Sequence, residues 1–213
     1  SYSSFWRWSL GRLSRMNFYH KSVRDLIRGV REKRISCGRA FESLKGLPYI
    51  DMGFAKLDTH RSLRKGFCEA IYARGKSPQH LEKITARHLK DGCDVILTKA
   101  DSRVYDALRI KHPQLKYNKS AGIVYFQAKR PPAKKGFISV VTAGTSDISA
   151  AEEAALMLEL MGDRVRRFYD VGVAGIHRVL DKRALLNKAS VIIVIAGMEG
   201  ALAGVIAGLV DKP

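Results

Sequence analysis

The sequence has few cysteines, no long apolar run and no acidic residue near its beginning. Its three cysteines, Cys37, Cys68 and Cys93, are an odd number without CxxC spacing. This pattern argues against a disulfide framework or a zinc site and favours a reducing compartment. The longest mostly apolar stretch, residues 190–210, is interrupted by Glu199 and four glycines, so we expect no membrane-spanning helix. The 46% of hydrophobic residues excludes a wholly disordered chain.

The first 24 residues contain no acid and are rich in serine, arginine and aromatic residues. Such a composition is typical of an organelle transit peptide, and a basic tail is the alternative. We therefore take residues 1–20 as a leader or tail. The expected location is cytoplasmic, or organellar (plastid or mitochondrion) if the leader is a transit peptide.

The net charge of +18 is unevenly distributed. Residues 137–213 hold 8 basic and 9 acidic groups, whereas residues 1–136 hold 30 basic and 11 acidic groups. This asymmetry indicates a nucleic-acid patch, a basic tail or a site for phosphorylated ligands, and composition alone does not choose among them.

Hydrophobic periodicity predicts a small α+β domain over residues 21–127. Ser77 and Pro78 have the residue types of a helix start. The expected helices are 21–34, 36–45, 79–90 and 102–111, and the expected strands are 53–57, 67–72, 94–98 and 122–127. The segment AKRPPAKKG that follows, residues 128–136, has the composition of a linker.

Residues 137–213 alternate strand and helix three times, which predicts an α/β domain with a parallel sheet. The expected strands are 137–142, 164–170 and 191–195, and the expected helices are 149–161, 176–188 and 201–209. In such sheets the ligand crevice lies at the carboxyl ends of the strands.

Each turn after a strand holds residues suited to chemistry. The first turn has hydroxyls, a carboxylate and a glycine before a helix, which suits a phosphate, although Asp147 is equally suited to capping that helix. The second offers a guanidinium for a phosphate and an imidazole for proton transfer. The third offers a carboxylate between glycines. The candidates are Gly144, Thr145, Ser146, Asp147, His177, Arg178, Gly197, Glu199 and Gly200.

A dense basic cluster follows Asp58 in the first domain, in the sequence DTHRSLRKGF. Arg61, Arg64 and Lys65 are suited to gripping phosphates, and a solvated basic loop is the alternative.

Four motifs together resemble the LarB family. They are GFAKLDTHRSLRKGFCEAIYARGKS, VVTAGTSDISAAEEAA, YDVGVAGIHRVL and VIIVIAGMEGALAGVIAGLV. This family comprises the pyridinium-3,5-biscarboxylic acid mononucleotide synthases of nickel-pincer cofactor biosynthesis. The second domain also resembles AIR carboxylase (PurE). The resemblance implies a three-layer, flavodoxin-like PurE domain.

The resemblance implies carboxylation of the pyridinium ring of nicotinic acid adenine dinucleotide by CO2 or bicarbonate, and hydrolysis of its phosphoanhydride with release of AMP. Glu199, His177 and Asp147 would be catalytic, and Gly144, Thr145, Ser146, Arg178, Gly197 and Gly200 would hold the mononucleotide half. Asp58, His60, Arg61 and Arg64 would hold the pyrophosphate or adenylate half. No metal site is implied, Mg²⁺ remains open as a cofactor, and a homo-oligomer is expected.

The sequence departs from the family in one respect. The family's nucleophilic cysteine follows the AGMEGA motif in an LNSC-like segment, which these 213 residues do not contain. We therefore expect a C-terminally truncated chain that is inactive as a fragment. Cys68 stands where many relatives have proline.

Two other functions remain open at this stage. An AIR carboxylase of purine biosynthesis shares the fold and the carboxylation, although the module around Asp58 argues against it. A nucleic-acid-binding protein would account for the basic charge, but no RRM, KH, zinc-finger or helix-turn-helix signature accompanies that charge.

Overall fold

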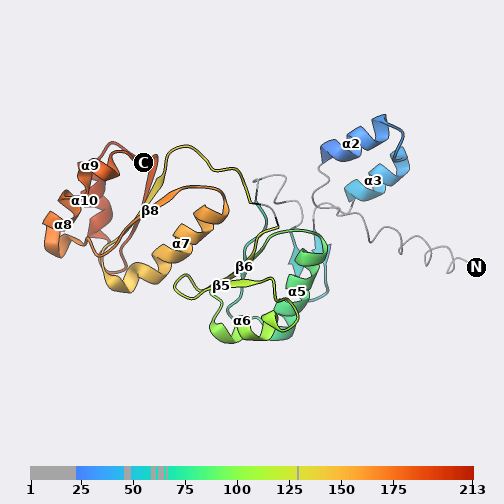
Figure 1. The fold of residues 1–213 in the computed structure, drawn as a ribbon, viewed down its shortest axis with the longest axis horizontal. Coiled ribbons are helices and arrows are strands. Elements are labelled where there is room, and N and C mark those ends of the chain that lie inside the picture. Colours follow the sequence, from blue (N-terminus) through green and yellow to red (C-terminus); the bar gives the residue numbers. More distant parts are fainter. Residues whose placement is uncertain (1–22, 46–48, 59–60, 62–64, 66, 129) are drawn as a thin grey trace, which may run out of the picture. The chain divides into compact units, whose positions relative to one another are not determined.

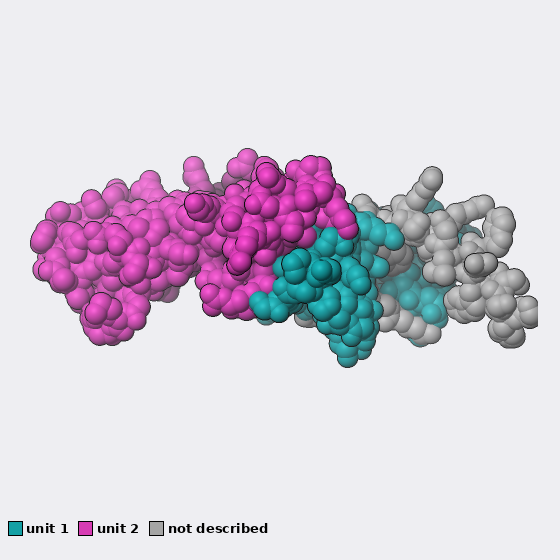
Figure 2. All heavy atoms as spheres, turned by 90° about the horizontal axis from the view of Figure 1, so that it is seen from below, with its two compact units in different colours: residues 1–71, 75–96 teal, residues 72–74, 97–213 magenta. Residues whose placement is uncertain are grey.

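The structure, a computed structural model, describes residues 23–45, 49–58, 61, 65, 67–128 and 130–213. The predicted leader, residues 1–20, lies outside these described residues. The chain divides into two compact units, coloured separately in Figure 2. Unit 1 consists of residues 1–71 and 75–96, and unit 2 of residues 72–74 and 97–213.

The described part of unit 1 begins with two helices joined by a short turn (Figure 1). Leu26 on the first helix and Ala40 on the second are buried, whereas Ile27 and Phe41 are exposed. A two-stranded antiparallel sheet follows, in which Ile50 pairs with Leu57. The elements are α2 (Val23–Arg31), α3 (Cys37–Lys45), β1 (Ile50–Asp51) and β2 (Lys56–Leu57).

Helix α5 (Pro78–Lys90) begins where the sequence predicts. The Ser77 hydroxyl accepts a hydrogen bond from the backbone N–H of His80 at 3.2 Å, and Pro78 occupies the first turn. The helix buries Leu81 and Ile84 on one face.

A four-stranded sheet follows, with strand order β3-β4-β6-β5. Its strands are β3 (Ile71–Tyr72), β4 (Val95–Thr98), β5 (Lys116–Asn118) and β6 (Ile123–Phe126). Strands β5 and β6 form an antiparallel hairpin. Helix α6 (Ser102–Arg109) lies between β4 and β5 in sequence, and Asp101 caps its first turn at Val104 N–H. The sequence did not predict β1 or β5.

The last part of unit 2 contains the predicted parallel sheet. Its strands are β7 (Ile138–Thr142), β8 (Val165–Phe168) and β9 (Val191–Ile195), in the order β8-β7-β9. Both pairings are parallel. The chain therefore folds as a mixed α/β protein with a flavodoxin-like, PurE-like sheet, which confirms the predicted fold class.

Alternation along the strands produces three layers. Val140 packs with Ala151 and Ala155 of α7 (Ile148–Leu160). Val141, the next residue of β7, points to the opposite face and packs with Leu202 and Ile206 of α10 (Ala201–Leu209). Successive strand residues face opposite sides, so each face of the sheet buries its own helix layer.

One predicted helix is wrong in detail. The sequence predicts a continuous helix over 176–188, but the structure has α8 (Ile176–Leu180) and α9 (Arg183–Leu186), separated by a turn at Asp181 and Lys182. Both short helices contribute one buried residue, Val179 and Leu186, to the same core.

The predicted linker, residues 128–136, has no helix or strand among its described residues. It is nevertheless held at the turn after α7. Gln127 Nε2 donates to the Leu160 carbonyl at 2.7 Å, Lys134 N–H donates to the Gly162 carbonyl at 3.0 Å, and Lys134 Nζ pairs with Asp163. Residues 97–127 and 137–213 belong to one unit, and a domain boundary at 128–136 stays a prediction.

None of the helices that the structure describes is long and apolar enough to cross a membrane.

Candidate functional site

The carboxyl ends of β7, β8 and β9 meet at one edge of the parallel sheet. β7 comes first in sequence and lies between the other two, so the chain leaves β7 toward β8 on one side and later returns to β9 on the other. The reversal makes the space between the loops after β7 and β9 the topological switch point, where α/β sheets bind ligands.

Asp147 joins these two loops. Its Oδ2 accepts a hydrogen bond from Gly144 N–H at 3.0 Å, within the loop after β7. Its Oδ1 accepts one from Gly197 N–H at 3.1 Å, in the loop after β9. Both carboxylate oxygens are therefore engaged by backbone amides. We call this arrangement the Asp147 clamp.

The loop after β7 forms a short 3₁₀ helix, Thr145–Asp147, directly before α7. Thr145 and Ser146 are exposed there, while Gly144 is half-buried. The two hydroxyls thus lie at the amino end of a 13-residue helix, where the helix dipole and free backbone amides favour an anion.

Backbone N–H groups of the loop after β8 fasten it to Thr142, the last residue of β7. Asp170 N–H donates to the Thr142 hydroxyl, and Val171 N–H donates to the Thr142 carbonyl, both at 3.0 Å. Gly172 approaches so closely that a Cβ there would lie 2.7 Å from the Ala143 carbonyl oxygen. Only glycine fits this approach without a shift.

The predicted His-Arg pair, His177 and Arg178, lies in α8, directly after this second loop. Arg178 Nη1 lies 2.9 Å from Asp170 Oδ2, so the guanidinium already has a carboxylate partner. The side chain also packs over Gly175, where a Cβ would lie 2.8 Å from Arg178 Nε. His177 is exposed.

The third loop presents its residues to solvent. Gly197, Met198 and Glu199 are all exposed, and Met198 is 94% exposed. Gly200 has a φ of 71° and begins the turn into α10. Glu199 therefore lies in an open loop in which Gly197, two residues before it, is held by the Asp147 clamp.

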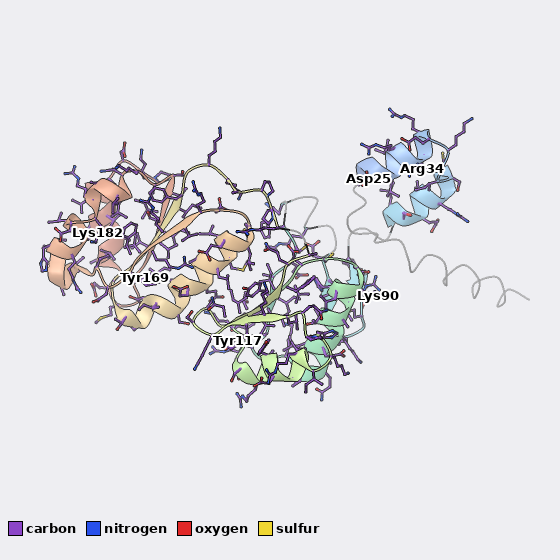
Figure 3. All side chains as sticks on the ribbon, viewed as in Figure 1. Asp25, Arg34, Lys90, Tyr117, Tyr169 and Lys182 are labelled. Carbon is purple, nitrogen blue, oxygen red and sulfur yellow. The ribbon has the colours of Figure 1, made fainter. Side chains whose placement is uncertain are left out.

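The sequence did not single out Tyr169, which follows β8 and is labelled in Figure 3. Its hydroxyl donates to Glu152 of α7 at 2.7 Å. Arg167 bridges Glu152 and Glu159 on the same helix. Burial, followed by the Glu152 hydrogen bond, raises the pKa of Tyr169 above its usual range, so the phenol remains protonated at neutral pH.

The candidates of unit 1 are only partly described. Asp58 N–H donates to Glu69 Oε2 at 2.9 Å. The Arg61 guanidinium lies over the Phe67 ring at 5.3 Å, and its buried Nε has no hydrogen-bond partner within the described part of the chain. His60 and Arg64 lie outside the described residues.

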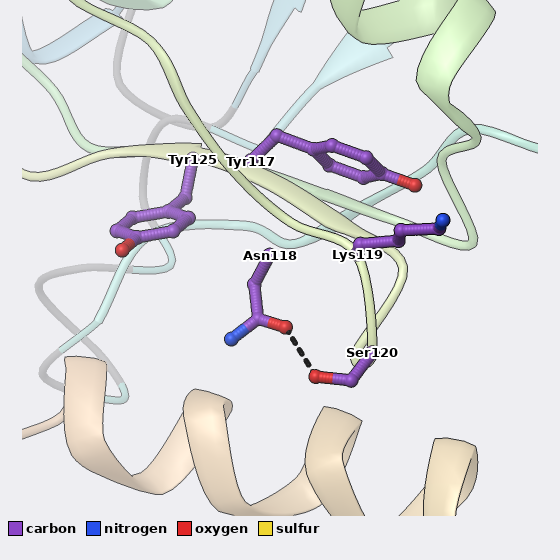
Figure 4. A pocket seen from close by; sticks show the side chains of 5 residues that line it. All are labelled: Tyr117, Asn118, Lys119, Ser120 and Tyr125. Carbon is purple, nitrogen blue, oxygen red and sulfur yellow. Dashed lines mark hydrogen bonds between the residues drawn. The ribbon is translucent and has the colours of Figure 1, made fainter.

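A hollow of about 680 Å³ lies at the β5–β6 hairpin, where no site residue was predicted. Figure 4 shows the Tyr117 and Tyr125 rings and the Lys119 chain around it. Asn118 accepts from the Ser120 hydroxyl at 2.8 Å and so holds the turn. Tyr117, in β5, stacks on Tyr105 of α6, with ring centroids 5.4 Å apart.

Across the ranges that the structure describes, no three histidine, cysteine, aspartate or glutamate side chains gather as a metal site would require. We assign no residues to Mg²⁺, and its participation stays a prediction.

Comparison with known proteins identifies the class. Residues 49–129 match the family described as "LarB/PurE-like N-terminal domain". The chain belongs to this LarB/PurE family. Over 202 residues it is 37% identical to the uncharacterized protein MJ0165 of Methanocaldococcus jannaschii, an alignment that covers 91% of this chain and 79% of that protein. Membership indicates a carboxylase-type enzyme.

Proposed function

We propose that this chain belongs to an enzyme that acts on nicotinic acid adenine dinucleotide in a LarB-type reaction, and that the 213 residues alone bind this substrate without turning it over. In that reaction CO2 or bicarbonate carboxylates the pyridinium ring, and hydrolysis of the phosphoanhydride releases AMP. The Asp147 clamp is the observation that carries the proposal. It holds the loops after β7 and β9 together at the switch point, where a nucleotide is expected to bind.

The loop after β7 supports binding of the mononucleotide phosphate. Thr145 and Ser146 offer exposed hydroxyls at the start of α7, and Gly144 keeps the backbone open to a ligand. Arg178 is the cation assigned to the same half, with Asp170 holding its guanidinium. Gly197 and Gly200 complete the proposed binding set from the loop after β9.

Proton transfer is assigned to Glu199 and His177, which are both exposed. A nucleophile, which the family's LNSC-like segment would supply, must first add to the pyridinium ring so that a ring carbon can attack CO2. That carbon must then lose its proton and the nucleophile must leave before the ring is aromatic again, so a proton acceptor is required. Asp147 accepts two backbone hydrogen bonds, which supports a positioning role. Its participation in proton transfer stays a prediction.

The adenylate or pyrophosphate half is assigned to unit 1. Arg61 supports this assignment because its buried Nε lacks a hydrogen-bond partner among described residues, and a phosphate oxygen would satisfy it. Asp58, His60 and Arg64 belong to the same proposed set.

The remaining parts of the proposal concern partners and location. We expect a homo-oligomer, CO2 or bicarbonate as co-substrate, and no nucleic-acid or membrane partner. We expect the protein in the cytoplasm, or in an organelle if residues 1–20 act as a transit peptide.

Calorimetric titration of the 213-residue chain with nicotinic acid adenine dinucleotide tests the proposal. Wild-type protein is expected to bind. Thr145→Val is expected to weaken binding about threefold to tenfold, which corresponds to one lost hydrogen bond. Ser149→Ala is the matched control, because Ser149 is an exposed hydroxyl one turn further along α7 and outside the proposed set.

Two results would overturn the assignment. If both variants bound the dinucleotide equally weakly, the phosphate would not bind at the loop after β7. Tighter binding of aminoimidazole ribonucleotide than of the pyridinium dinucleotide would favour AIR carboxylase instead.

A further inference from the structure

Two of the three cysteines lie together in unit 1. Cys68 precedes β3 by three residues and Cys93 precedes β4 by two, and these strands are neighbours in the sheet. The Cys68 and Cys93 side chains lie within hydrogen-bonding reach of each other, and the Cys93 thiol also lies 4.0 Å from the Asp91 carbonyl oxygen. Both cysteines are free thiols. The fold therefore brings together two thiols that are 25 positions apart in sequence.

The two thiols differ in exposure. Cys93 is buried, with 8% of its surface exposed, whereas Cys68 is half-buried and lies in a segment without helix or strand. A solvent reagent therefore reaches Cys68 first, and the irregular backbone around it can adjust to a new bond.

The surroundings also give the Cys68 and Cys93 thiols different pKa values. The hydrogen bond from Cys93 and a second one from the Asp94 backbone N–H lower the pKa of Cys68 to about 7, although burial and the Asp94 carboxylate oppose them. The hydrogen bond to Cys68, burial, and the charges of Cys68, Asp91 and Asp94 raise the pKa of Cys93. At neutral pH a substantial fraction of Cys68 is thus thiolate, whereas Cys93 keeps its proton.

We propose that Cys68 and Cys93 form a thiol–disulfide exchange site whose substrate is a small-molecule disulfide. The Cys68 thiolate attacks one sulfur of the disulfide, forms a mixed disulfide and releases one thiolate, which takes up a proton. Cys93 then loses its proton and attacks the Cys68 sulfur, which expels the second small thiol. The two protein thiols supply two electrons, and the products are one internal disulfide and two small thiols.

The third cysteine provides a control within the same molecule. Cys37 is an exposed free thiol at the start of α3. Exposure alone would make Cys37 the most reactive thiol, whereas the proposed site makes Cys68 react first.

The test is incubation of the reduced 213-residue chain with glutathione disulfide, followed by alkylation and peptide mapping. We expect the wild-type chain to accumulate a Cys68–Cys93 disulfide, with Cys68 consumed faster than Cys37. Cys93→Ser should stop at one glutathione on Cys68, and Cys68→Ser should leave Cys93 unmodified. Circular dichroism of each variant checks that it folds.

The pH dependence provides an independent readout. The rate of Cys68 modification should rise through pH 7, below the range near 8.5 in which an ordinary cysteine titrates. Cys93, Asp94 and, through Cys93, Asp91 are the groups that set this titration.

Three results would overturn the proposal. Cys37 could be consumed faster than Cys68, the wild-type chain could retain a mixed disulfide at Cys68 without an internal bond, or the Cys68 rate could rise only near pH 8.5. The first and second results come from the wild-type protein alone, so they do not depend on any variant folding.

Discussion

Asp147 is the residue on which the geometry of the crevice depends. A single carboxylate satisfies amides from two loops that are 50 residues apart in sequence. The sequence identified Asp147 as a candidate because it follows a strand and precedes a helix. Its contact with Gly197 could not be predicted from that local pattern, because it requires β7 and β9 to be neighbours.

Asp147→Asn should destabilise the protein by about 1–3 kcal/mol. Asparagine has one accepting oxygen, so one of the two amides would face an NH2 group and remain unsatisfied. Chemical unfolding monitored by circular dichroism measures the change. Asp211→Asn is the control, because that carboxylate is 78% exposed and should change stability by less than about 0.5 kcal/mol. Equal stabilities of the two variants would contradict the importance of the Asp147 clamp.

The cysteine pair shows the same limit of sequence reasoning. Spacing rules treat Cys68 and Cys93 as isolated because no CxxC motif joins them. Their proximity arises from the pairing of β3 with β4, so the signal was the position of Cys68 inside the predicted strand 67–72 and of Cys93 just before the predicted strand 94–98.

At the scale of elements, hydrophobic periodicity predicted the long helices and the buried strands well. Helix α10 begins and ends at the predicted residues, and α5 starts at its predicted cap. β5 was missed because Lys116–Asn118 has no apolar alternation, and its pairing with β6 is what makes it a strand. Periodicity also predicted one helix in place of α8 and α9, because Val179 and Leu186 pack into the same hydrophobic core.

The first turn of α5 gives a prediction at this scale. Ser77→Ala should cost about 1 kcal/mol, because the hydroxyl that accepts the His80 N–H is lost. Thermal unfolding should show a Tm lower by about 2–4 °C. Gln79→Ala, on the same exposed turn, serves as the comparison and should leave the Tm nearly unchanged.

Two glycines in unit 2 should respond oppositely to alanine. Gly172→Ala would place a Cβ 2.7 Å from the Ala143 carbonyl oxygen and should destabilise the protein by about 1–3 kcal/mol. Gly204→Ala in α10 meets no atom within 4 Å and should stabilise it by about 0.5–1 kcal/mol, because alanine favours a helix. Denaturant unfolding measures both, and changes of the same sign would refute the packing described for the second loop.

At the scale of the whole molecule, two features of the sequence concern the organisation of the chain: the segment 128–136 and the uneven distribution of charge. Composition predicted a linker, and the segment indeed lacks helix and strand in its described residues. The hydrogen bonds of Gln127 and Lys134 to the turn after α7 were not predictable, because they join parts distant in sequence. The basic excess of residues 1–136 has no structural account beyond the proposed anion site.

Limited trypsin digestion tests how firmly this segment is held. Cleavage after Lys134 and Lys135 should be slow in the native chain, since the backbone must first leave the turn at Gly162. Gly162→Ala should accelerate cleavage about tenfold. Its φ of +87° disfavours alanine, and the new Cβ would lie 2.8 Å from the Pro132 carbonyl oxygen. Gly204→Ala is the control, and equal cleavage rates would show that the segment is free.

The contacts around Phe67 and Glu69 have a mechanical consequence. Phe67 lies under the Arg61 guanidinium, and Glu69 accepts a hydrogen bond from the Asp58 amide. The two residues on either side of Cys68 therefore each contact one residue of the segment DTHRSLRKGF. Adjacent residues share one backbone and cannot shift independently. A disulfide between Cys68 and Cys93 would therefore shift Phe67 and Glu69, and with them the positions of Arg61 and Asp58.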